Sequence, residues 1–208
     1  MKPITFAELA TLVYFYIDAS KYLTADESEF TEFALDTELG YLRKGDKVYF
    51  IFKGSCSMID WVYNFKVGKV DFDYGDFKVH QGINEKFKVT FDYVSSKIKP
   101  NDKVFFTGHS LGGALSLLMA YAVKVQLKAN IQGVYVFGAP RVGGEGWCIA
   151  YNNLLADVTF AYTTEGDIVP SLPPRWLGYY QVGQQISIKG NKCVSAHLPW
   201  FYVMGLRN

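Results

Sequence analysis

The chain has 208 residues, half of them apolar, and its 21 basic and 20 acidic side chains leave a formal net charge of +1. This length and composition predict a single domain over residues 1–208 with a large hydrophobic core. The near-neutral charge gives no indication of a nucleic-acid partner, and no apolar run approaches the roughly 18–20 residues of a transmembrane segment.

The N-terminal segment does not have the form of a secretory signal peptide. Its apolar stretch, Leu9–Ile17, is short, has Glu8 before it and Asp18 after it, and lacks a small-x-small cleavage site. The three cysteines are an odd number without metal-ligand spacing, so they indicate neither a disulfide framework nor a zinc site. These features favour a cytoplasmic location, with secretion as the alternative if a leader has been removed.

Three helices and two strands are predicted over the first half of the chain, besides the short helix over 57–65 described below. An amphipathic helix is expected from about Phe6, and a helical pattern recurs near Asp26–Leu39. The run "KVYFIFKGS" (47–55) predicts a buried strand that ends at a glycine, and "KVDFDYGDFKVH" (69–80) predicts a second strand with a turn inside it. Apolar residues near helical spacing then predict a helix over Ile83–Ile98.

The second half alternates strands with helices. The run "KVFFTGHS" (103–110) predicts a strand, and "LGGALSLLMAYAVKVQLK" (111–128) predicts a long buried helix. The remaining elements are a strand at 133–140, a helix at 147–155, a strand at 158–164 and one or two strands at 179–188. This alternation indicates an α/β fold with a mainly parallel central sheet flanked by helices.

A serine lies between two glycines where the strand over 103–110 passes into the helix over 111–128. Gly108-x-Ser110-x-Gly112 matches the G-x-S-x-G pattern of a strained turn that exposes a nucleophilic serine. The glycines allow backbone and helix to approach closely, and the free N–H groups of the helix N-terminus favour negative charge. We therefore interpret Ser110 as a candidate nucleophile, with a tight turn in a packed core as the alternative.

A serine hydroxyl is a weak nucleophile that needs a general base, and the chain has only three histidines. His109 adjoins the serine, so its side chain is expected to leave the turn in another direction and to pack or form a local hydrogen bond. His80 precedes the serine and is expected to be structural. The chain order serine, acid, histidine that accompanies this kind of turn selects His197, with a structural loop histidine as the alternative.

A third residue must orient His197 and stabilise its imidazolium form. The acidic residues between the serine and this histidine are Glu145, Asp157, Glu165 and Asp167. Catalytic residues collect at the carboxyl ends of parallel strands, whereas Asp157 stands at the start of the strand over 158–164 and Glu145 opens a helix. Asp167, just beyond the end of that strand, is the favoured acid, and Glu165 is the second choice.

Acyl transfer also needs hydrogen-bond donors for the developing oxyanion. The backbone N–H of Leu111, the residue after the serine, is one expected donor. The second is expected from the loop after an earlier strand, where "FKGS" places the N–H and the hydroxyl of Ser55. A simple strand end is the alternative reading of this segment.

A short amphipathic helix is predicted just after this loop, over residues 57–65. Met58, Trp61, Val62 and Phe65 recur at i, i+3, i+4 and i+7 and form one apolar face. We interpret this helix as a candidate lid whose apolar face covers the site and binds acyl chains. The alternative is a helix that packs on the core.

Together these segments resemble the class 3 lipases, the fungal-lipase-like branch of the α/β-hydrolases. The resemblance runs in family order from about Val48 to Phe201. It rests on "FKGS" with "DWVYNF", "VHQGINEKF", "VFFTGHSLGGALSLLMA", "VYVFGAPRVG", "DIVPSLPP" and "HLPWF".

The resemblance implies a serine hydrolase that cleaves carboxylic esters of lipids, as a triacylglycerol lipase or carboxylesterase, by way of an acyl-enzyme. It implies a triad of Ser110, Asp167 and His197, with Ser55 and Leu111 at the oxyanion hole. No cofactor or metal is implied, and the expected partner is the lipid or ester substrate, without an obligate protein partner. A phospholipase A1 or galactolipase is one alternative, and a catalytically silent lipase-like binding protein is another.

Overall fold

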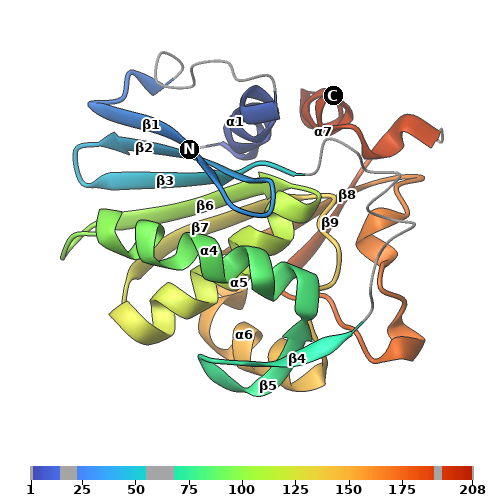
Figure 1. Cartoon of the computed structure of the whole chain (residues 1–208). Coiled ribbons are helices and arrows are strands. Elements are labelled where there is room, and N and C mark those ends of the chain that lie inside the picture. The colour runs from blue at the N-terminus through green and yellow to red at the C-terminus, as the bar shows by residue number, and fades with distance from the viewer. Residues whose placement is uncertain (1, 15–22, 55–67, 190–193, 208) are drawn as a thin grey trace.

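The computed structural model describes residues 2–14, 23–54, 68–189 and 194–207 and shows a central sheet between two layers of helices (Figure 1). The strands are β1 (Glu27–Phe33), β2 (Thr37–Lys44), β3 (Lys47–Phe52), β4 (Lys69–Phe72), β5 (Gly75–His80), β6 (Lys103–His109), β7 (Asn130–Phe137), β8 (Thr159–Thr164) and β9 (Gln184–Ile188). The helices are α1 (Pro3–Tyr14), α4 (Gln81–Lys97), α5 (Leu111–Leu127), α6 (Glu145–Leu155) and α7 (Pro199–Arg207). None of the helices described here is long and apolar enough to cross a membrane.

The central sheet has the strand order β1-β2-β3-β6-β7-β8-β9, and its strands from β3 to β9 run parallel. This confirms the predicted α/β fold. The strands of such a sheet are apolar along most of their length because helices cover both faces, and residues 48–52 of β3 are all buried. Helices α1 and α7 lie on one face, and α5 with α4 and α6 lies on the other (Figure 1). The carboxyl ends of β6, β7 and β8 therefore meet at one edge, where the predicted site residues follow.

The helix predicted near Asp26–Leu39 is wrong, because this segment belongs to an antiparallel hairpin of β1 and β2 at the edge of the sheet. The turn of the hairpin contains Leu35 and Asp36 at φ values of 60° and 49°. A right-handed helix cannot contain this left-handed backbone. Lys86 of α4 donates hydrogen bonds to the carbonyl oxygens of both residues. A contact with a distant helix thus stabilises the turn, and a local apolar pattern does not report such a contact.

The other elements predicted within the described residues lie close to their observed limits. The first helix begins at Pro3, ahead of Phe6, and proline is favoured in a first helical turn because its missing N–H would be unpaired there. The segment 69–80 forms the β4–β5 hairpin outside the central sheet. The segment 179–188 contributes the single strand β9, while Tyr180 makes an isolated bridge to Gly143.

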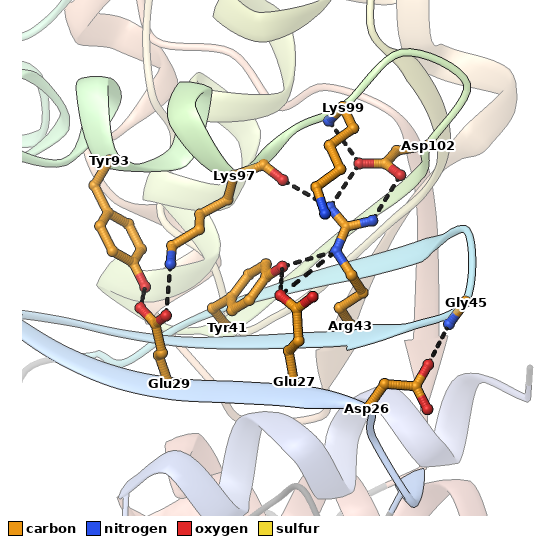
Figure 2. Close-up of polar contacts among 10 residues, drawn as sticks. All are labelled: Asp26, Glu27, Glu29, Tyr41, Arg43, Gly45, Tyr93, Lys97, Lys99 and Asp102. Carbon is orange, nitrogen blue, oxygen red and sulfur yellow. Dashed lines mark hydrogen bonds and ion pairs between the residues drawn. The ribbon is translucent and has the colours of Figure 1, made fainter.

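A buried ion pair ties the β1–β2 hairpin to the helical layer at the amino ends of the parallel strands (Figure 2). The guanidinium of Arg43 on β2 donates to both carboxylate oxygens of Asp102 at 2.8 Å, and to the carbonyl oxygen of Lys97 at 2.8 Å. Figure 2 also shows Glu29 of β1, which accepts from Lys97 at 2.6 Å and from Tyr93 at 2.7 Å. The edge strands are therefore held to the end of α4 and to the loop before β6.

The Arg43–Asp102 pair makes the fold sensitive to acid. Burial disfavours the ionised carboxylate of Asp102, but the hydrogen bonds from Arg43 and from the N–H of Lys99 outweigh burial, so the pKa of Asp102 lies below its ordinary value. A carboxyl whose pKa is depressed by folding adds stability above its unfolded pKa. That stability is lost as the pH falls through the folded pKa.

We expect Asp102→Asn to lower the free energy of unfolding by about 3–5 kcal/mol at pH 7, because it leaves the Arg43 charge buried without its partner. Urea unfolding monitored by circular dichroism measures this loss. The gap between the two proteins should narrow as the pH falls below about 4, because the Asp102 carboxyl of the unfolded wild type then binds a proton that the folded state does not. The matched control is Asp46→Asn, because Asp46 makes an exposed 2.7 Å pair with Lys103 and its loss should move the midpoint little. Equal effects of the two substitutions would contradict the role of the buried pair.

Candidate active site

Ser110 occupies a strained turn between β6 and α5. Its backbone has φ of 56° and ψ of −128°, outside the regions that residues with side chains ordinarily adopt. A Cβ atom at Gly108 would lie 2.4 Å from the backbone of Gly112, and one at Gly112 would lie 2.1 Å from the carbonyl oxygen of Phe52. The two glycines are thus required for strand, helix and the end of β3 to meet at this serine.

Hydrogen bonds hold the strained turn in place. The N–H of Ser110 donates to the carbonyl oxygen of Phe137 at 2.8 Å, and its own carbonyl oxygen accepts from Gly113 at 2.9 Å and from Ala114 at 3.2 Å. Leu111 is the first residue of α5, and the first N–H groups of a helix have no acceptor within it. The backbone at Leu111 can therefore donate to an anion beside Ser110, assisted by the helix dipole.

His197 and Asp167 form a buried pair. Nδ1 of His197 lies 2.8 Å from Oδ2 of Asp167, and the two side chains are 4% and 0% exposed. The N–H of Val169 donates to Oδ1 of the same carboxylate at 2.9 Å. The hydroxyl of Tyr202 on α7 donates to Oδ2. Burial and the neighbouring Asp167 carboxylate raise the pKa of Tyr202 well above its ordinary value, so this hydroxyl keeps its proton and acts as a donor.

Several contacts bring Ser110 and the His197–Asp167 pair to the same place. The Ser110 N–H donates to Phe137, the residue before Gly138. A Cβ atom at Gly138 would lie 2.9 Å from Oδ2 of Asp167 and 3.0 Å from Cε1 of His197. Nε2 of His197 is buried and makes no hydrogen bond within the described part of the chain. A histidine nitrogen without a partner near a strained serine has the geometry that a general base needs, and such contacts often tighten only when substrate binds.

His80 and the other three acidic candidates do not share this cluster. His80 caps α4 through Nδ1, which accepts from the N–H of Ile83 at 3.3 Å. Glu165, the second choice of acid, is exposed, and so are Asp157 before β8 and Glu145 at the start of α6. The structure therefore pairs His197 with the favoured acid, Asp167.

The prediction missed residues that support the pair from other segments. Besides Tyr202 and Gly138, Thr164 donates its hydroxyl to the carbonyl oxygen of Ala196 at 2.9 Å and so holds the residue before His197. No periodicity or motif spacing marks these residues, because they act through contacts between distant segments. The positive φ of Gly138, 60°, was signalled only by a glycine inside the strand predicted over 133–140.

The second expected oxyanion donor, Ser55, and the candidate lid helix over 57–65 lie outside the described residues. So do its apolar residues Met58, Trp61, Val62 and Phe65. The structure describes the strand end that leads there. Lys53, 4% exposed, donates its N–H to the Glu38 carbonyl oxygen at 3.0 Å and forms an ion pair with the Glu38 carboxylate. This end of β3 is thereby fixed to β2.

No group of side chains suited to a metal ion occurs in the described part of the chain. The site as described consists of the serine, the histidine, the carboxylate and the backbone donors. Together these groups can attack a carbonyl carbon, move a proton and hold a developing oxyanion.

Comparison with known proteins gives consistent matches. The family model described as "Lipase (class 3)" matches residues 49–176. A lipase of Rhizomucor miehei is 32% identical over 157 residues, which are 69% of this chain and 42% of that protein. The secreted mono- and diacylglycerol lipase MDL5 of Malassezia globosa is 38% identical over 119 residues, which are 53% of this chain and 38% of that protein. The chain thus spans less than half the length of these curated relatives.

Solved structures show the same fold at lower identity. A lipase of Rhizopus microsporus var. chinensis has a TM-score of 0.76 and 24% identity, over 94% of this chain and 75% of that one. Lipase II of Rhizopus niveus has a TM-score of 0.78 and 22% identity, over 94% of this chain and 81% of that one. These structures share the α/β-hydrolase fold with this chain.

We expect Gly138→Ala to destabilise the protein more than Gly45→Ala. Both glycines have a left-handed backbone, at φ of 60° and 57°, so each substitution carries a conformational cost of roughly 1–2 kcal/mol. A Cβ atom at Gly45 meets nothing within 4 Å, whereas one at Gly138 also meets Tyr202 Oη at 2.8 Å. Overpacking should add about 1–3 kcal/mol at Gly138. Urea unfolding of the two variants measures the difference, and equal losses would show that the site is not crowded there.

Proposed function

The chain belongs to the class 3 lipase family, and from this premise we propose that it hydrolyses carboxylic esters of lipids through an acyl-enzyme on Ser110. One observation carries the proposal: the buried His197–Asp167 hydrogen bond of 2.8 Å leaves Nε2 of His197 without a partner in the described residues, beside the strained Ser110 turn. The names of the relatives support lipids, and acylglycerols in particular, as the substrate class.

In the proposed first step, Oγ of Ser110 attacks the ester carbonyl carbon while Nε2 of His197 takes the hydroxyl proton. Asp167 keeps the imidazole in the required tautomer through Nδ1 and stabilises the imidazolium cation. The oxyanion accepts a hydrogen bond from the N–H of Leu111, and the Ser55 loop is the expected second donor.

The tetrahedral intermediate then collapses, and the alcohol leaves with the proton that His197 returns to it. The product of this half-reaction is an acyl ester of Ser110. Water attacks that ester, again giving a proton to His197, and the same donors hold the second oxyanion. The bond between the acyl carbon and Oγ then breaks, His197 returns the proton to Oγ, and the fatty acid leaves. The proposed lid helix over 57–65 would govern access to this site and stays a prediction from the sequence.

We expect Ser110→Ala to lower kcat/KM for ester hydrolysis by at least about 10⁴-fold while leaving the fold intact, because the nucleophile is lost. His197→Ala should cost a similar factor, and the double variant should be no worse than either, because the two residues act as a unit. The assay uses short-chain and long-chain acyl esters, a diacylglycerol and a phospholipid.

Ser96→Ala is the control, because Ser96 is exposed on α4 and bonds only the local Tyr93 carbonyl oxygen among the interactions described for it. Turnover that survives in Ser110→Ala would contradict the proposed nucleophile. Inertness of the folded wild type towards every ester would indicate a binding protein. A preference for the phospholipid would replace acylglycerols as the substrate class.

We expect Tyr202→Phe to lower kcat about tenfold with little change in KM, because a hydrogen bond to a charged group contributes about 1.5 kcal/mol. The ring keeps its packing against His109 at 5.6 Å, while the hydroxyl that donates to Asp167 is removed. Tyr151→Phe is the matched control. Its buried hydroxyl bonds Thr159 at 2.8 Å, at the opposite end of β8, so stability should fall while kcat holds. Unchanged kcat in Tyr202→Phe would exclude a role in orienting the acid.

A further inference from the structure

The proposed triad does not use His109, the residue immediately before Ser110. Its side chain is nevertheless buried in contact with two residues of the candidate site. It is the last residue of β6 and only 2% exposed. Its ring centroid lies 4.5 Å from that of His197 and 5.6 Å from that of Tyr202. The imidazole therefore lies between the base and the tyrosine that supports the acid.

One hydrogen bond links His109 to the base. Nε2 of His109 contacts the backbone carbonyl oxygen of His197. A carbonyl oxygen only accepts, so Nε2 must carry the hydrogen. Burial, and then the nearby His197, lower the pKa of His109 well below its ordinary value, so the imidazole is neutral at neutral pH. The side chain is thus fixed in the tautomer that has its proton on Nε2.

This hydrogen bond connects the backbone of His197 to the residue next to Ser110. Ser110 follows His109 in the chain, so one peptide unit joins the serine to the side chain that holds the His197 backbone. The ring of His197 is held separately, by Asp167. Two independent supports of this kind determine both the position of the imidazole and the direction of its free Nε2.

We propose that His109 is a positioning residue that fixes the separation between the Ser110 hydroxyl and Nε2 of His197 through its hydrogen bond to the His197 carbonyl oxygen. The inference rests on the proposed function, in which His197 is the base. His109 takes no proton from the serine and touches no substrate atom. Its effect falls on kcat, because a displacement of about 1 Å in a reacting group can cost about 10²-fold in rate.

A histidine that merely fills space makes a different prediction, and three substitutions separate the two. His109→Phe keeps an aromatic ring and removes the donor. His109→Gln brings an amide N–H to the place of Nε2–H. His109→Asn, the matched control, carries the same amide one methylene short of that place.

The experiment measures kcat and KM on a soluble short-chain ester, with urea unfolding for stability and NMR for the low-field Nδ1 proton of His197. We expect kcat to fall about 10²-fold in the Phe and Asn variants, with KM changed less than about twofold. The Gln variant should recover to within about fivefold of wild type. The low-field proton should persist in wild type and the Gln variant and broaden or shift in the Asn variant.

His80→Asn serves as a second control, because His80 is also a buried histidine but caps α4. This variant should keep its kcat, because asparagine can also cap the helix. Wild-type kcat in the folded Phe and Asn variants would overturn the inference. If those variants do not fold, the Gln variant tests the inference alone. A near-wild-type kcat in the Gln variant supports the inference. A folded Gln variant whose kcat has fallen about 10²-fold overturns it.

The failure of the inference is distinguishable from failure of the proposed function. If wild type hydrolyses esters and Ser110→Ala does not, the function stands whatever the His109 variants do. If wild type itself is inert, the proposed function fails first.

Discussion

The left-handed backbone of Ser110 determines how β6, α5 and the end of β3 meet at the candidate site. Holding a residue with a side chain in this conformation costs of order 1–3 kcal/mol of folding free energy. The contacts of the surrounding fold must offset this cost. The strand on one side, the helix on the other and the N–H donated to Phe137 leave the serine no other conformation. Gly112 then allows the end of β3 to come within contact of the first turn of α5. The serine, the first-turn N–H groups of α5 and the end of β3 are thus brought together by one turn.

The opposite wall of the site comes from the C-terminal third of the chain. Asp167 follows β8, His197 precedes α7, and Tyr202 lies within α7. All three meet Gly138, where a side chain would collide with them. At the amino ends of the parallel strands, Arg43 and Asp102 hold the edge strands to the helical layer. Strained, closely packed groups therefore lie at the carboxyl ends of the strands, and a satisfied ion pair stabilises the amino ends.

Much of this arrangement could be predicted because it depends on local signals. Short stretches of sequence are enough to recognise the apolar strands, the long buried helix over 111–128 and the glycines around Ser110. The preference for Asp167 over Glu165 agrees with the observed contact to His197, since position after a parallel strand is also a local signal. Its role as the catalytic acid stays a proposal.

The failures have a common physical cause. The β1–β2 hairpin was read as a helix because its turn depends on Lys86, which lies far along the chain. Tyr202 and Gly138 were missed because each acts only through contacts made by folding. His109 was expected to pack or to make a local hydrogen bond, but its partner is His197, 88 positions away. Side-chain contacts between distant segments leave no periodic signal in the sequence.

The most direct test of the central claim is to trap the acyl-enzyme. The protein is mixed with an activated acyl ester, quenched in acid during turnover and digested for mass spectrometry. The account predicts one acyl group, on the peptide that contains Ser110, and its absence when the ester is omitted. Steady turnover with Ser110 unmodified, or with the acyl group on another residue, would contradict it.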